Sequence, residues 1–169
     1  MLQIRKENDI YYAKSSVVDG VYKIDSRLGR AVDKGLDEFR DKKLFDFGFS
    51  EPSKVEMQNG SKSYFLTKGG QDWWSNGVKM DTGAVGSYIS SLRDLSASKF
   101  VQSGFTNPTV EISVTSGDGK RVEKVSIAKS GSSYIAKRES DPTFYEVDAS
   151  SVETLLKSAN NIKPATSHG

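Results

Sequence analysis

The stretch VSIAKSGSSYIAKRESDPTFYEVDASSVETLLKSANNI, residues 125–162, decides the fold. Its first part holds three short runs in which apolar and polar residues alternate, as in strands with one buried face. The runs carry Val125 with Ile127, Tyr134 with Ala136, and Tyr145 with Val147. Beyond residue 148 the apolar residues take a helical spacing, at Val152, Leu155, Leu156, Ala159 and Ile162. The stretch predicts an antiparallel meander followed by one helix packed on the sheet.

The same pattern recurs along the chain. A shift of 123 residues, without a gap, places Leu2 and Ile4 on Val125 and Ile127. A looser copy of the pattern lies in the middle of the chain, where a shift of 61 residues places Leu66 on Ile127. We therefore expect an α+β fold of repeated antiparallel β-meander units, each followed by one helix, in about three copies over about 1–48, 54–101 and 109–163. The copies would form a single domain, residues 1–163, followed by a flexible tail, residues 164–169.

The first copy is expected to be truncated. The strand predicted at Val110 to Thr115 has no counterpart in it, because that counterpart would precede Met1. We therefore expect Leu2 to Lys6 to form a strand that lacks a neighbour on one side or is paired unusually.

Helices are predicted after each meander. The apolar stripes run from Leu28 to Phe39, from Val85 to Leu92 and from Val152 to Ile162. Asp25, Asp81 and Asp148 precede these stripes and are predicted to cap the helices, with Ser150 and Glu153 spaced as a capping box.

Composition excludes several classes of function. The chain has 24 Lys and Arg against 22 Asp and Glu, so no strong positive field favours nucleic acid. It has no cysteine, and its one histidine is His168 in the predicted tail, which argues against thiolate, histidine-based and Cys- or His-ligated metal sites. No run of about 20 apolar residues predicts a membrane span. We assign no catalytic residue, metal or cofactor, and expect a soluble fragment.

The candidate binding residues are Trp73 and Trp74. Adjacent residues of a strand point to opposite faces, so one tryptophan should pack against a helix while the other stays exposed. The first would match Tyr11 and Tyr134 in the other copies. An exposed tryptophan could stack on a sugar or anchor a partner protein, although peripheral packing is the simpler interpretation.

Several segments resemble a bacterial family catalogued as domain of unknown function 4340. They are VYKID at 21–25, DEFRDKKLFDF at 37–47, the Trp73-Trp74 hairpin, LRDL at 92–95, YIAK at 134–137 and YEVD at 145–148. The resemblance implies the soluble part of a longer protein with an N-terminal membrane anchor, often encoded beside ABC-type transporter components. It implies an extracytoplasmic location at a bacterial membrane, and it supplies no catalytic residues.

Two functions remain open from the sequence. The first is a non-enzymatic binding or scaffolding module, accessory to a transporter or other membrane assembly, with a protein partner from the envelope, no nucleic acid and no direct membrane insertion by this fragment. The alternative is a carboxylate-dependent hydrolase or ligand-processing enzyme with a cleft between repeats. An enzyme should show a polar pocket with convergent carboxylates, whereas a scaffold should show an exposed apolar patch or a free sheet edge.

Overall fold

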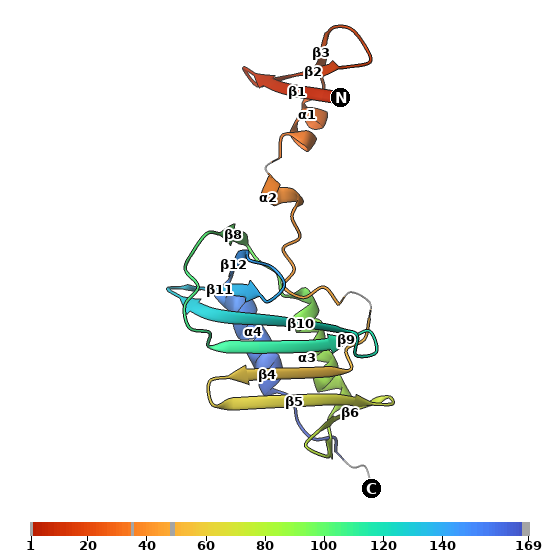
Figure 1. Ribbon diagram of the computed structural model, residues 1–169, viewed down its shortest axis with the longest axis vertical. Coiled ribbons are helices and arrows are strands. Elements are labelled where there is room, and N and C mark those ends of the chain that lie inside the picture. The colour runs from red at the N-terminus through yellow and green to blue at the C-terminus, as the bar shows by residue number, and fades with distance from the viewer. Residues whose placement is uncertain (1, 35, 48–49, 167–169) are drawn as a thin grey trace. The chain divides into compact units, whose positions relative to one another are not determined.

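The chain is described by a computed structural model over residues 2–34, 36–47 and 50–166 (Figure 1). It divides into two compact units, which we call the N-terminal unit, Met1–Asp41, and the C-terminal unit, Lys42–Gly169. Each unit is described by itself. The single domain expected from the sequence stays a prediction.

The N-terminal unit is a small antiparallel sheet followed by two short helices. The sheet has the order β1-β2-β3. Its strands are β1 (Leu2–Glu7), β2 (Ile10–Ser15) and β3 (Val21–Ile24). The prediction of a strand at Leu2 to Lys6 is confirmed, and β1 pairs with β2 alone among the described strands.

The helix expected from Leu28 to Phe39 is wrong as a single element. Instead, α1 (Ser26–Val32) ends at the cap residue Asp33, and the short α2 (Leu36–Phe39) follows. The Asp33 carboxylate accepts a hydrogen bond of 2.9 Å from the Tyr11 hydroxyl on β2, and its N–H donates to the Gly29 carbonyl. Gly35 follows in the sequence, and glycine loses more backbone entropy in a helix than any other residue. An apolar stripe alone did not reveal this interruption.

The C-terminal unit is built on one nine-stranded antiparallel sheet. Its order is β7-β6-β5-β4-β9-β10-β11-β12-β8. The strands are β4 (Lys54–Asn59), β5 (Lys62–Gly69), β6 (Asp72–Ser75), β7 (Val78–Lys79), β8 (Lys99–Val101), β9 (Val110–Ser116), β10 (Arg121–Ser130), β11 (Ser133–Arg138) and β12 (Phe144–Val147).

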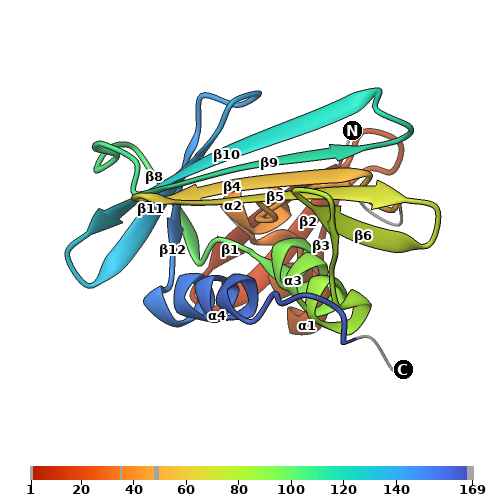
Figure 2. The same ribbon diagram turned by 90° about the horizontal axis from the view of Figure 1, so that it is seen from below.

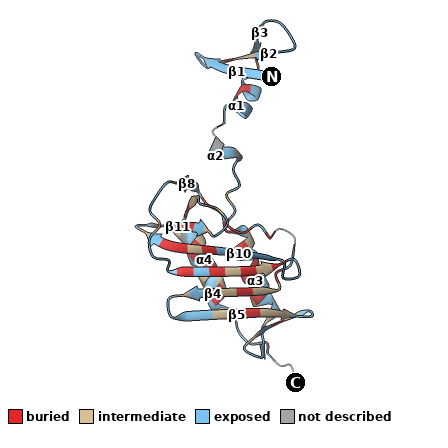
Figure 3. Cartoon of the chain, viewed as in Figure 1, coloured by how far each residue is buried: buried red, intermediate tan, exposed pale blue. Residues whose placement is uncertain are grey.

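Two helices cover one face of this sheet. They are α3 (Thr82–Asp94), which follows β7, and α4 (Ala149–Asn160), which follows β12, and both lie on the same side in Figure 2. Alternate residues of the central strands are buried beneath them, as the bands along β4, β9 and β10 show in Figure 3. The helices supply Val85, Tyr88, Ile89, Leu92, Val152, Leu155 and Ala159 to this core.

The sheet joins two meanders edge to edge. β4 and β9 pair antiparallel at its centre, with Met57 opposite Ile112. The fold is therefore α+β with antiparallel sheets, as predicted. The short β8, which pairs with β12, was not predicted. That the meanders are copies of one repeated unit stays a prediction.

The predicted helix caps are confirmed at two of three positions. The Asp25 carboxylate accepts from the N–H of Arg27, and the Asp81 carboxylate accepts from that of Ala84. Asp148 also occupies the N-cap position of its helix, but its side chain makes no capping bond. The capping box at Ser150 is wrong, because α4 begins at Ala149 and Ser150 therefore lies inside the helix.

The predicted flexible tail begins as paired backbone. Pro164 forms a β-bridge with Met80, and the N–H of Ala165 donates to the Lys79 carbonyl at 2.9 Å. His168 lies outside the described residues. No helix in the described part of the chain is both long and apolar enough to cross a membrane.

Candidate functional site

The face of the nine-stranded sheet opposite α3 and α4 is the candidate site, and we call it the open face. Its side chains stand in transverse rows, because residues paired across antiparallel strands share a face. The register gives Trp74, Thr67, Lys54, Thr115 and Val122 as the first row. The second is Phe65, Glu56, Ser113 and Lys124, and the third is Ser63, Gln58, Glu111, Ser126 and Lys137.

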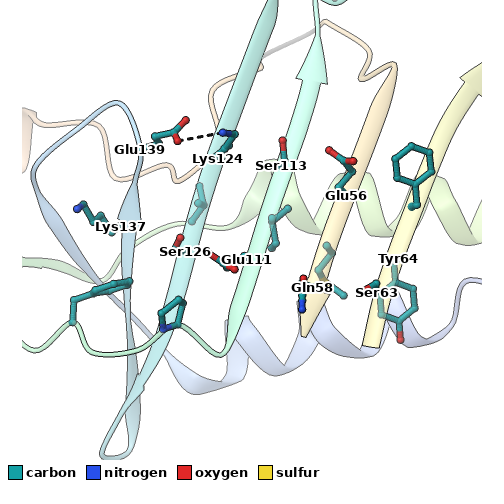
Figure 4. A pocket seen from close by; sticks show the side chains of 16 residues that line it. Glu56, Gln58, Ser63, Tyr64, Glu111, Ser113, Lys124, Ser126, Lys137 and Glu139 are labelled. Atoms are coloured by element: carbon teal, nitrogen blue, oxygen red, sulfur yellow. Dashed lines mark hydrogen bonds and ion pairs between the residues drawn. The ribbon is translucent and has the colours of Figure 1, made fainter. Parts of the chain in front are cut away.

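A pocket of about 680 Å³ opens over the second and third rows (Figure 4). The loop between β8 and β9 contributes Phe105 and Pro108 to its lining. The Phe105 ring stacks on Phe144 with 5.8 Å between centroids, and Phe144 pairs with Lys137 across β11 and β12. The loop thereby closes one end of an otherwise open polar surface.

Ion pairs hold part of this surface. The Lys54 ammonium lies 2.9 Å from the Glu56 carboxylate and 4.8 Å from the centroid of the Phe65 ring. Lys124 lies 3.2 Å from Glu139 at the side of the pocket. Such exposed pairs contribute little free energy of folding, about 0–1 kcal/mol each. They do orient the long side chains over the strands.

The third row carries opposite charges that make no ion pair with the described residues. Glu111 stands between Gln58 and Ser126, and Lys137 stands on the far side of Ser126. A ligand that lies across the strands would meet a carboxylate, a hydroxyl and an ammonium in sequence. This pattern suits a polar, extended ligand such as a polypeptide.

Glu56, Glu111 and Glu139 line the pocket, and the register makes Glu56 and Glu111 diagonal neighbours on β4 and β9. Glu56 and Glu139 each lie beside a lysine, and the register places Glu111 opposite Gln58 instead of another carboxylate. Within the described residues, no group of three or more acidic or histidine side chains could hold a metal ion.

The two predicted binding residues lie on opposite faces of β6, as expected. Trp73 is 3% exposed and belongs to the core, so it cannot reach a partner. Trp74 is 37% exposed and stands in the first row of the open face, diagonal to Phe65 on β5. The structure therefore leaves Trp74 as the accessible member of the pair.

Sequence reasoning missed the rest of the face. The alternating polar positions of β4 and β9 were a usable signal, because Glu56, Glu111 and Ser113 fall between buried residues and Gln58 follows one. Their juxtaposition depends on the pairing of β4 with β9, which are separated by four other strands and a helix in the sequence. That register could not be derived from local patterns.

Comparison with known proteins gives one family. The sequence model described as Domain of unknown function (DUF4340) matches residues 5–110. The chain belongs to this family. No curated protein and no solved structure matches it. In this DUF4340 chain the matched region runs from β1 to the first residue of β9, so it includes Trp74 and Phe65 but excludes most of the third row.

Proposed function

We propose that this DUF4340 protein is a non-enzymatic binding module that holds an extended segment of a partner protein on the open face of its nine-stranded sheet. The observation that carries the proposal is the pair of exposed aromatic side chains, Trp74 and Phe65, beside two polar rows on the face opposite α3 and α4. Aromatic side chains supply large contact area at low entropic cost and dominate many interfaces.

The surrounding charges support a polypeptide ligand. Lys54 over the Phe65 ring joins an aromatic surface to a cation, and Glu111 and Lys137 offer one acceptor and one donor group to backbone or side-chain partners. A single carboxylate without an ion pair gives no separate support to the hydrolase alternative.

The setting of the partner follows from the family resemblance. We propose that the partner is an envelope or transporter component and that the parent protein is membrane-anchored with this region extracytoplasmic. We also propose that the three strand runs, each ending in a helix, are copies of one repeated unit. The match of Tyr11, Trp73 and Tyr134 across the copies supports this repeat.

Peptide display on the purified chain tests the binding function. Peptides selected on the wild-type protein should bind Trp74→Ala at least about tenfold more weakly, since an aromatic anchor contributes more than 1.4 kcal/mol. Trp74→Phe should retain most of the affinity. Trp73→Ala is unsuitable as a control, because removing a buried tryptophan costs about 3–5 kcal/mol of folding free energy. Equal affinity for wild type and Trp74→Ala would refute the aromatic site.

Crosslinking then relates the face to a natural partner. Solubilised envelope captured on the chain should give crosslinks to Lys54, Lys124 and Lys137, whose ammonium groups project from the open face. Crosslinks confined to lysines elsewhere would move the interface away from this face.

A further inference from the structure

The loop between β8 and β9, residues 102–109, covers one end of the open face. Ala128 on β10 pairs with Ile135 on β11, one row beyond the third row and on the same face. Both side chains are buried, at 0% and 3% exposed, although neither belongs to the described core beneath α3 and α4. The loop accounts for this burial, since a Cβ added at Gly104 would lie 3.5 Å from the Ile135 side chain. The loop is therefore packed on the sheet beside the third row.

Aromatic packing and a backbone hydrogen bond fix this loop as a wall of the pocket. The Phe105 ring lies parallel to the Phe144 ring, with 4° between the planes and 5.8 Å between the centroids. At the other end of the loop, the Thr109 N–H donates to the Ile127 carbonyl at 2.8 Å. Phe105 and Pro108 both line the pocket. The third row therefore runs beside an apolar wall that the C-terminal unit builds from its own residues.

Lys137 is the cation of the pocket lining that makes no ion pair with a described residue. The other lysine of the lining, Lys124, pairs with Glu139 at 3.2 Å. Glu111 is likewise unpaired among the described residues, and Ser126 separates it from Lys137 across the strands, as Figure 4 shows. Two strand spacings amount to roughly 9.6 Å. The third row thus presents a cation and an anion at a fixed separation.

A ligand on this face meets side chains and not free backbone groups, because β9, β10 and β11 are each paired with strands on both sides. A segment that lies across the strands must therefore keep its own backbone groups in water. A polyproline II helix does so, since it has no internal hydrogen bonds and a fully solvated backbone. Its side chains three residues apart stand on one side, at roughly 9.3 Å. This repeat matches the separation of Glu111 from Lys137.

We propose that the partner segment binds along the third row as a polyproline II helix, with an acidic residue at Lys137 and a basic residue three positions away at Glu111. This inference rests on the proposed function and names the chemistry of its ligand. A third contact, three residues further, falls over β5, where Phe65 offers an aromatic surface. Prolines between the charged residues pack against Phe105 and Pro108. Grooves lined by aromatic residues bind such segments because the preformed helix loses little entropy on binding.

Three capped nonapeptides test the proposal on the full chain. The first, Pro-Glu-Pro-Pro-Lys-Pro-Pro-Leu-Pro, carries its charges three residues apart. The second has lysine in place of the glutamate, and the third, Pro-Glu-Pro-Lys-Pro-Pro-Pro-Leu-Pro, has its charges two residues apart. Titration calorimetry should show that the first peptide binds at least about fivefold more tightly than either of the others, since only it places opposite charges at both sites. Equal affinity of the first and third peptides, or no binding of the first at millimolar concentration, overturns the proposal.

Charge reversal in the protein assigns the contact at Lys137. Lys137→Glu should bind the first peptide about tenfold more weakly than the wild type does, and the two-lysine peptide more tightly, because attraction and repulsion exchange places. The matched control is Lys157→Glu on α4, which changes the net charge equally on the other side of the sheet. This control should leave both affinities unchanged. An unchanged preference in Lys137→Glu, or an equal change in Lys157→Glu, would refute the charge assignment.

Further outcomes separate this inference from the proposed function. Peptides selected by display that depend on Trp74 but lack opposite charges three residues apart would support the open face as a binding surface and overturn the polyproline II ligand. Binding of the first peptide that depends on Lys137 and not on Trp74 would support this inference and remove the aromatic anchor. NMR should show the amide resonances of Ser126 and Lys137 shifting on titration. Shifts confined to other residues would overturn the site, including the case in which the chain itself covers the third row.

Discussion

Gly29 of α1 lies directly against the Tyr11 ring of β2. A Cβ added at this position would lie 2.1 Å from the Tyr11 ring, well inside van der Waals contact. Gly29→Ala should therefore displace either α1 or the ring and destabilise the unit by about 1–3 kcal/mol. Amide exchange of β2 measures the loss.

The matched control is Gly86→Ala in α3. No atom lies within 4 Å of a Cβ built there, and alanine is favoured over glycine inside a helix. We expect this variant to stabilise the C-terminal unit by about 0.5–1 kcal/mol. If both substitutions change the free energy of unfolding in the same direction, steric contact with Tyr11 is not the cause of the effect of Gly29→Ala.

The Asp141 carboxylate makes the folding stability depend on pH in the acid range. Hydrogen bonds from the Thr143 side chain and backbone, together with one of 2.7 Å from the Tyr145 hydroxyl, lower the pKa of its carboxyl from 3.8 to about 2. Because the folded-state pKa is depressed, this contribution is present above the ordinary pKa and is lost as the pH falls towards 2. Solvent screening limits it to about 1 kcal/mol.

Denaturation of Asp141→Asn tests this contribution. The wild type should lose more stability than the variant between pH 4 and 2, and the two should differ most near neutral pH. Parallel pH profiles for both proteins would exclude a role for this carboxylate.

Helix ends allow a comparison between two aspartates at equivalent positions. Asp81 accepts a 2.7 Å hydrogen bond from the N–H of Ala84, whereas the Asp148 side chain makes no such bond. Asp81→Ala should cost about 1 kcal/mol. Asp148→Ala should lower the free energy of unfolding by a few tenths of a kcal/mol, which is about the favourable effect of a carboxylate near a helix N-terminus. Urea titration of the two variants measures both, and equal costs would contradict the assigned capping geometry.

The elements were predicted where local chemistry determines them. Alternation identified β1, β10, β11 and β12, and the aspartates before α1, α3 and α4 marked the starts of these helices. The end of α1 was not predicted, because it depends on the contact between Asp33 and Tyr11, which are distant in sequence. The open face was not predicted for the same reason. The exposure of Trp74 follows from strand alternation, but Glu111 lies beside its neighbours on β4 only because β4 pairs with β9.

The whole chain contains two cores of very different extent. In the N-terminal unit Tyr11 is the large side chain that is buried among the described residues, whereas the C-terminal core extends over the sheet, α3 and α4. Stability follows buried apolar area, so the N-terminal unit should unfold first. Both tryptophans lie in the C-terminal unit, so tryptophan fluorescence reports on that unit.

Urea titration followed by two probes tests this difference. Amide protection in β2 should disappear at lower urea than the tryptophan fluorescence transition, because the N-terminal unit has the smaller core. Gly29→Ala should move the first transition to lower urea and leave the fluorescence midpoint unchanged, and Gly86→Ala should move only the second. Coincident transitions that both substitutions shift together would instead show one cooperative domain over residues 1–163.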